Sequence, residues 1–384
     1  MARIALANPP ICGELQTHRL GIGHLGLGYI AACLLRDGHE VLTLDAKLER
    51  LTGQEISHRL DGFRPAVLGV TAMTHEIHRA VEVCEIAKRI DPKVVTIVGG
   101  PHATALPERT LQEFSAIDVA VVGEGEETAC EIARAFDGGS SSLRDIAGIA
   151  YRDGGTVIRN PNRLWISDLD KQPFPAWHLF PKAPWPLFAG RGCPFGCKFC
   201  QRVLGRKVRM RSADNVLAEI DAMEIELGAR GSFFQDETFA LNRKWADEFL
   251  TKLEERNRLR GYVWHWRANS RVNLADLELY RRMKAAGCRT LDFGVESGDA
   301  EILKRIGKSI TKDMAVKAVA TAKEAGLRTS VFFIIGHPGE TLWTAFETVF
   351  FAGRLGSDEI SVGVMVPYPG TEIWEMASTG QYNY

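Results

Sequence analysis

The sequence has 384 residues, of which 45% are hydrophobic and 25% charged, and 47 basic residues balance 48 acidic ones to a net charge of −1. This length predicts two domains with hydrophobic cores, and the balanced charge argues against a basic surface for nucleic acid or an anionic membrane. Residues 1–30 lack the basic, apolar and small-residue regions of a signal peptide, and no stretch approaches 18 apolar residues, so we expect a soluble cytoplasmic protein.

Residues 1–136 alternate short β-branched runs with longer amphipathic stretches, a pattern typical of βαβ units around a parallel sheet. Strands are predicted at 3–8, 40–45, 66–71, 94–99 and 119–123, and helices near 24–37, 53–61, 75–90, 105–113 and 126–136. Five such units predict a flavodoxin-like doubly wound α/β sheet, whose ligands bind at the carboxyl ends of the strands near the topological switch point.

Unusual residues follow these strands. Glycines at a strand end let the backbone approach a large flat ligand, although ordinary turn residues are the alternative interpretation. A Gly-x-Gly-x-x-Gly spacing at Gly21, Gly23 and Gly26 lies 13 residues beyond the first strand, which is too far for the tight first turn of a nicotinamide site.

Four segments together resemble the cobalamin-binding domain at the front of many radical S-adenosylmethionine (SAM) enzymes: Asn8-Pro9-Pro10, the run Leu25-Gly26-Leu27-Gly28-Tyr29 that opens the first helix, Gly38-His39-Glu40-Val41 and Gly99-Gly100-Pro101-His102. The resemblance covers residues 1–136. It implies cobalamin held by backbone and loop contacts at the sheet edge. The residues implied to contact it are Asn8, His24, Leu25, Gly26, Thr71, Met73, Thr74, Gly99, Gly100, His102, Gly123, Glu124 and Gly125.

Proteins that bind cobalt through a histidine carry Asp-x-His-x-x-Gly after the first strand. The corresponding segment here is Gln16-Thr17-His18-Arg19-Leu20-Gly21, in which glutamine replaces the carboxylate that would orient the imidazole. His18 is therefore a candidate cobalt ligand, with a surface-loop histidine as the alternative.

Residues 138–190 change character. A Gly/Ser-rich turn at 138–142 precedes a predicted hairpin, with strands at 149–152 and 156–159 around Asp153-Gly154-Gly155. The segment that follows is rich in proline and predicts a stiff extended linker. Its aromatic residues, Phe174, Trp177, Phe180 and Trp185, are expected to anchor it across the two domains, with substrate binding as the alternative. The predicted division is thus 1–140, a connector at 141–184, and 185–384.

Cys193, Cys197 and Cys200 form a Cys-x₃-Cys-x₂-Cys segment directly after an apolar run. Zinc sites usually show two close pairs of ligands, and no second pair follows here. Three thiolates in one short loop suit a cubane iron–sulfur cluster with one iron left open. The pattern is the signature of the radical SAM superfamily, in which the open iron binds the amino and carboxylate groups of SAM. The other five cysteines are scattered in apolar runs and are expected to be small buried residues.

Downstream, strands are predicted at 232–235, 262–267, 290–295, 329–335 and 359–364, and helices near 213–227, 242–258, 274–286, 311–325 and 340–354. With the strand before the cysteines this makes six βα units, which fit the partial (β/α)₆ barrel of the superfamily. Chemistry in such barrels is located where the strands end.

The resemblance implies SAM contacts at these strand ends. Asp236 and Glu237 would bind the amino group of SAM, with helix capping by Asp236 as the alternative. Arg271 would clamp its carboxylate. Glu296 would hydrogen-bond the ribose hydroxyls or the amino group, whereas Gly336 and the backbone of Phe199 would lie near adenine, with Glu340 opening the next helix.

Taken in order, these features resemble cobalamin-dependent radical SAM enzymes over nearly the whole chain. The resemblance implies a 4Fe-4S cluster that cleaves SAM to a 5′-deoxyadenosyl radical, and methylcobalamin that methylates an unactivated carbon, less often phosphorus, of a small molecule. An electron donor of the flavodoxin or ferredoxin type is expected. No catalytic side chain is predicted.

Two alternatives stay open. One is a non-methylating radical reaction such as ring formation, because a relative that builds the fifth ring of bacteriochlorophyll resembles this layout. The other is a cobalamin-binding sensor or carrier without catalysis. Relatives commonly continue past the sixth strand with a helical segment that closes the substrate cavity, whereas this sequence reaches Tyr384. We expect that the substrate or a partner chain closes the site, or that the chain is shortened.

Overall fold

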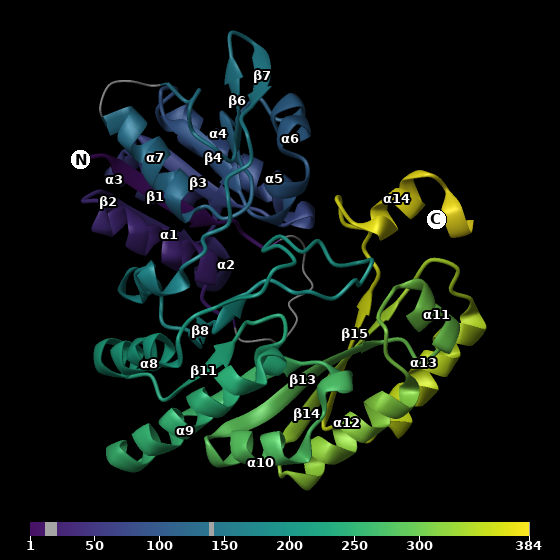
Figure 1. Ribbon diagram of the computed structural model, residues 1–384. Helices are drawn as coiled ribbons and strands as arrows, with labels where there is room; N and C mark the ends of the chain where they lie inside the picture. The colour runs from purple at the N-terminus through teal and green to yellow at the C-terminus, as the bar shows by residue number, and fades with distance from the viewer. Residues whose placement is uncertain (12–20, 138–141, 384) are drawn as a thin grey trace. The chain divides into compact units, whose positions relative to one another are not determined.

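The computed structural model describes residues 1–11, 21–137 and 142–383 of the chain (Figure 1). The chain divides into two compact units, Met1–Trp185 and Pro186–Tyr384. Each unit is built on its own mainly parallel sheet. No helix in the described ranges is long and apolar enough to cross a membrane.

The first unit is built on a seven-stranded sheet with the order β2-β1-β3-β4-β5-β6-β7. Its strands are β1 Arg3–Asn8, β2 Glu40–Asp45, β3 Val67–Thr71, β4 Val95–Gly99, β5 Val119–Val121, β6 Ile149–Asp153 and β7 Thr156–Arg159. The first five are parallel, which confirms the predicted flavodoxin-like order. The predicted hairpin is also confirmed, and it pairs antiparallel with β5 as an extension of this sheet.

Seven α-helices belong to the described part of this unit: α1 Leu25–Arg36, α2 Ala46–Glu49, α3 Gly53–Phe63, α4 Ile77–Ile90, α5 Pro101–Ala105, α6 Pro107–Glu113 and α7 Glu126–Asp137. Short 3₁₀ turns lie at η1 Thr74–Glu76, η2 Leu169–Lys171 and η3 Trp177–Leu179. The helix predicted near 105–113 is confirmed as α6, whereas the short helix α5 before it was not predicted. The two helices are separate because Leu106 precedes Pro107 and therefore leaves the helical region, with φ −133°.

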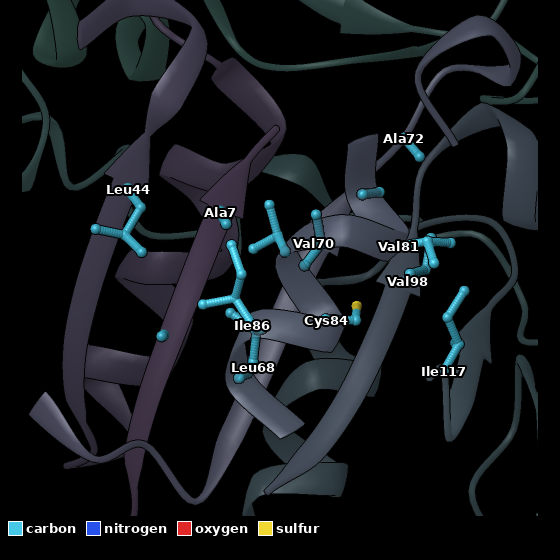
Figure 2. Close-up of a cluster of buried hydrophobic side chains, with 14 of the residues drawn as sticks. Ala7, Leu44, Leu68, Val70, Ala72, Val81, Cys84, Ile86, Val98 and Ile117 are labelled. Carbon is cyan, nitrogen blue, oxygen red and sulfur yellow. The ribbon is translucent and has the colours of Figure 1, made fainter. Parts of the chain in front are cut away.

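A hydrophobic core fills the space between the sheet and the helices α3 and α4 (Figure 2). Leu44, Leu68 and Val98 come from the strands, and Ile86 and Cys84 come from α4. The scattered cysteines Cys33, Cys84, Cys130 and Cys288 are buried as expected, and Cys12 lies outside the described residues. Burial raises the pKa of Cys130 to about 12, so this thiol stays protonated and unreactive at neutral pH.

Trp177 holds the proline-rich segment against the first unit. Its ring lies 5.2 Å from that of Trp185, and a methyl group at Gly28 would come within 2.9 Å of Pro175 and 3.3 Å of Trp177. Gly23 faces the same two tryptophan rings. These two glycines of the 21–28 run therefore allow close packing of the connector.

The second unit contains a six-stranded parallel sheet with the order β15-β14-β13-β12-β11-β8, which confirms the six predicted strands. The strands are β8 Pro186–Leu187, β11 Gly231–Phe234, β12 His265–Ser270, β13 Cys288–Glu296, β14 Arg328–Ile335 and β15 Glu359–Val364. A separate antiparallel pair, β9 Gly190–Arg191 and β10 Arg209–Met210, was not predicted.

The helices of this unit are α8 Ala213–Leu227, α9 Arg243–Arg260, α10 Leu277–Ala285, α11 Ala300–Arg305, α12 Lys312–Glu324, α13 Leu342–Arg354 and α14 Glu372–Ser378, with 3₁₀ turns η4 Phe239–Leu241, η5 Val272–Leu274 and η6 Gln381–Asn383. The prediction of a strand at 262–267 is wrong by three residues. The N–H of Trp264 donates to the side chain of Asn257 in α9, so the aromatic residues before His265 form the corner between helix and strand.

Candidate active site

The three predicted iron ligands lie in the loop that joins β9 to β10, which we call the cysteine loop (residues 192–208). Cys193 is half-buried, Cys197 is buried and Cys200 is exposed. Three thiols in one short loop are the donor set of a cubane iron–sulfur cluster, which presents a separate iron to each thiolate.

Because β12 ends at Ser270, Arg271 is the first residue after this strand, and it is buried against the cysteine loop. Its Nη1 donates to Cys197 Sγ at 3.5 Å, its Nη2 donates to the Lys308 carbonyl at 2.6 Å, and the guanidinium lies 3.8 Å from the centre of the Phe195 ring. With Nε bonded to Asn273, three of its five N–H donors are used by residues that the structure describes, which leaves two for a ligand. Arg271 thus positions the cysteine loop.

The same surroundings favour a thiolate at Cys197. A hydrogen bond from Cys200 and the positive charges of Lys308 and Arg271 outweigh burial and lower the pKa of Cys197 to about 5. Because the thiolate is the form that binds metal, Cys197 is the one of the three thiols whose surroundings favour the metal-binding form. Burial raises the pKa of Cys193, and the hydrogen bond that Cys200 donates to Cys197 raises the pKa of Cys200.

Glu296 ends β13, at a β-bulge against β14, and has a left-handed backbone with φ 75°. Such a backbone is costly for a residue other than glycine and is found most often at functional sites. Its carboxylate accepts a hydrogen bond from Lys308 Nζ at 2.7 Å, and both side chains are less than a tenth exposed. Lys308 Nζ also lies 5.7 Å from the centre of the Phe199 ring. Lys308, which was not predicted, therefore lies beside two residues that were predicted to contact SAM, Glu296 and Phe199.

We expect Gly294→Ala to disturb this pair. A methyl group at residue 294 would clash with Glu296 Oε1 and lie 2.8 Å from Lys308 Nζ, so both side chains would have to move. We expect the variant to lose about 1–3 kcal/mol of unfolding free energy and to bind SAM more weakly in equilibrium dialysis. The control is Gly353→Ala in α13, where nothing lies within 4 Å of the added methyl. Equal behaviour of the two variants would contradict the prediction.

Asp236 follows β11 and is buried with both carboxylate oxygens bonded to backbone. It accepts the N–H of Ala189 at 2.9 Å and of Gly190 at 2.8 Å. Asp236 therefore ties β11 to the turn between β8 and β9, and it does not cap a helix, because Asn242 caps α9. Glu237, beside it, is exposed. Of the two, Glu237 is the carboxylate accessible to a ligand.

Burial raises the pKa of Asp236 to about 7, although the two N–H bonds oppose the shift. Between about pH 4 and pH 7 the folded protein therefore keeps a proton on Asp236 that the unfolded chain has lost. As the pH rises through this range, the free energy of unfolding falls by at most about 1.4 kcal/mol per pH unit. We expect Asp236→Asn to flatten this slope in urea unfolding followed across that range. Asp214→Asn, at an exposed carboxylate, is the control, and an unchanged slope in Asp236→Asn would refute the assignment.

Gly336 follows β14 with φ 91°, and its N–H donates to the carboxylate of Glu340. Glu340 does not begin a helix, because α13 starts at Leu342 and is capped by Thr341. His337 was not predicted. It is buried, and its Nε2 lies 3.4 Å from the Glu296 carbonyl. Burial lowers the pKa of His337, so a neutral imidazole lies next to the Glu296 backbone.

In the first unit, the parallel register brings the predicted cobalamin residues to one sheet edge. Asn8 pairs with Asp45 across β1 and β2, and Thr71 pairs with Gly99 across β3 and β4. Met73 and Thr74 follow directly at η1. Gly100 has φ 94°, and a methyl group there would lie 2.9 Å from Thr71 Oγ1. Only glycine allows this close approach of the two strand ends.

Buried polar atoms at this edge have no hydrogen-bond partner among the described residues: Asn8 Oδ1, Asp45 Oδ2, Thr74 Oγ1 and His102 Nδ1. Leaving such atoms unpaired is costly, and a ligand that carries amide groups would supply both donors and acceptors. Burial raises the pKa of Asp45, whose other oxygen binds the side chain of Asn8 at 2.8 Å. The edge therefore fits the peripheral amides of a corrinoid.

His24 caps α1, because its Nδ1 accepts the N–H of Leu27 at 3.1 Å, and burial lowers its pKa to about 4. Leu25 is half-buried and Gly26 exposed. His18 lies outside the described residues. An ion pair between the partly exposed Lys47 and the buried Glu76, with Glu76 also accepting the N–H of Met73, was missed because the two residues lie in α2 and η1 rather than at strand ends.

The residues after β5 serve internal contacts. The N–H of Gly123 donates to Thr104 at 3.1 Å, and Glu124 accepts the N–H of Ile166 at 2.8 Å. A methyl group at Gly125 would lie 3.1 Å from Ile30. This turn therefore fastens the connector to the first unit, in addition to any role it has toward a ligand.

Comparison with known proteins matches both units. The family model of the B12 binding domain matches residues 19–133, and that of the radical SAM superfamily matches residues 187–352. An uncharacterized methyltransferase of Pyrococcus horikoshii is 37% identical over 92% of this chain and 78% of its own length. The anaerobic magnesium-protoporphyrin IX monomethyl ester cyclase of Rubrivivax gelatinosus is 29% identical over 91% of this chain, which spans 65% of the cyclase.

Among solved structures, the radical S-adenosylmethionine methyltransferase TsrM from Kitasatospora setae, with cobalamin and a 4Fe-4S cluster bound, matches with a TM-score of 0.81. The match covers 98% of this chain and 75% of that one, at 20% sequence identity. At this identity the likeness is one of fold.

Proposed function

The chain belongs to the radical SAM superfamily, in the group that carries a B12-binding domain, and from this premise we propose that it is a methyltransferase acting on an unactivated carbon, or on phosphorus, of a small molecule. The cofactors of this group are a 4Fe-4S cluster, SAM and cobalamin. The observation that carries the proposal is the cysteine loop, whose Cys197 lies against Arg271 and Lys308 at the carboxyl ends of the second sheet.

When bound, the cluster and SAM supply a radical that removes a hydrogen atom, and methylcobalamin supplies the methyl group. The chain's own residues hold these reactants. Arg271 keeps Cys197 in place, and Lys308 neutralises and orients the Glu296 carboxylate toward the predicted SAM site. Glu237 and the two remaining N–H groups of Arg271 are the proposed partners of the SAM amino and carboxylate groups.

A second candidate is radical ring formation without methyl transfer, which the similarity to the anaerobic cyclase supports. Product analysis separates the two. Equimolar 5′-deoxyadenosine and S-adenosylhomocysteine are expected from a methyltransferase, whereas 5′-deoxyadenosine with a cyclised product and no S-adenosylhomocysteine would favour the cyclase.

The test begins with anaerobic reconstitution of the protein with iron, sulfide and cobalamin. We expect about four irons and one cobalt per chain, and SAM cleavage with a low-potential reductant before any substrate is known. A protein that holds cobalt, but no iron, and leaves SAM intact would instead be a sensor or carrier. We further propose that the enzyme works in the cytoplasm, where its cysteines stay reduced, and that a flavodoxin or ferredoxin reduces it.

A further inference from the structure

The outer face of the cysteine loop rests on the connection between α11 and α12. The N–H of Lys198 donates to the carbonyl of Ile306 at 2.9 Å. Gly307 has φ 67°, and a methyl group there would lie 3.0 Å from the carbonyl oxygen of Gly196. The α11–α12 connection is thus in direct backbone contact with the residues beside Cys197.

A surface hollow of about 610 Å³ opens over this connection. Lys304 of α11 and Lys312, the first residue of α12, line it together with Gly307. Ser309, also at its wall, has a left-handed backbone with φ 55°. Strained positions of this kind collect at functional sites. The left-handed backbone of Ser309 therefore marks the wall of the hollow as a candidate functional surface.

Exposed positive charge continues from the hollow onto the cysteine loop. The guanidinium of Arg206 lies 3.9 Å from the position of a methyl group at Gly196, and Lys207 follows it. Two carboxylates, Glu301 and Asp313, also line the hollow. We call Lys304, Lys312, Arg206 and Lys207 the basic rim; none of the four forms an ion pair with another residue in the described ranges. On a chain with a net charge of −1, this is a local excess of positive charge.

We propose that the basic rim docks an acidic one-electron carrier protein, which delivers its electron to the cluster through the cysteine loop. The inference rests on the proposed function, because only a bound cluster needs this electron. The carrier is oxidised by one electron and the cluster is reduced by one, and no bond forms or breaks in either. Complementary charge speeds such an encounter, and electron-transfer complexes typically have small interfaces.

The test measures reduction of the reconstituted holoprotein in anaerobic stopped flow, with photoreduced flavodoxin as the probe and the cluster absorbance as the signal. We expect Lys304→Glu/Lys312→Glu to lower the second-order rate about tenfold at low salt, and the difference to shrink at high salt. The matched control, Lys244→Glu/Lys317→Glu, makes the same charge change at exposed lysines that do not line the hollow.

Reduction by dithionite reports on the cluster alone and should be equal in all three proteins. If flavodoxin reduced the two double variants at the same rate, whether or not that rate was below the wild-type rate, the docking proposal would be overturned. Dithionite-driven SAM cleavage by the same proteins would still support the proposed enzymatic function. A wild-type protein without iron, or without dithionite-driven SAM cleavage, would instead overturn the proposed function itself.

Discussion

Replacing Cys197 by alanine is expected to abolish cluster binding and SAM cleavage. The thiolate at Cys197 is the buried one of the three, and Arg271 and Lys308 stabilise its negative charge. Without it the loop offers two cysteines, one of them exposed, which cannot complete the three-point attachment of a cubane. The variant should fold, with a loss of about 1–3 kcal/mol because the buried N–H of Arg271 loses its acceptor.

The matched control is Cys288→Ala. Cys288 is equally buried in β13 of the same unit, and burial raises the pKa of its thiol, so it has the character of a core residue. Iron analysis after anaerobic reconstitution is the measurement. We expect about four irons per chain in Cys288→Ala and none held as a cluster in Cys197→Ala. Full iron content in Cys197→Ala would rule out the cysteine loop as the cluster site.

Replacing Lys308 by methionine is expected to destabilise the second unit strongly. Lys308 Nζ lies 2.7 Å from Glu296 Oε1 with both side chains less than a tenth exposed. Removing the lysine leaves a carboxylate buried without its partner, which typically costs about 3–5 kcal/mol. Urea unfolding monitored by circular dichroism measures the loss. Arg281→Met, at an ion pair that is more than half exposed, should have no measurable effect.

The double variant Lys308→Met/Glu296→Gln separates stability from chemistry. It removes the uncompensated charge, so most of the lost stability should return, because a buried pair can be replaced by uncharged groups of similar size at little cost. SAM cleavage should not return, because Glu296 is proposed to contact SAM. If the double variant were as unstable as Lys308→Met, the ion pair would not be the cause of the loss; if it cleaved SAM at the wild-type rate, Glu296 would have no role there.

The sequence by itself determined the order of the strands in the two sheets and of the longer helices between them, the six βα units of the second sheet and the position of the cysteine loop. These features depend on residues close together along the chain. Alternation of apolar and polar residues defines a strand, and Cys193, Cys197 and Cys200 are brought together by a single loop. The strand ends that carry Asn8, Thr71 and Gly336 follow from the same local pattern.

The partners of these residues were decided only by the tertiary structure. Lys308 is 12 residues from Glu296 and 37 from Arg271, and it meets both because the loop after α11 folds back over the end of β13. Asp236 reaches Ala189 and Gly190, 47 and 46 residues away, through the pairing of β11 with β8. Gly28 faces Trp177 because the connector packs on α1. Sequence periodicity records which face of an element is apolar, whereas strand register and helix packing, set by the whole core, decide which side chains meet across that distance.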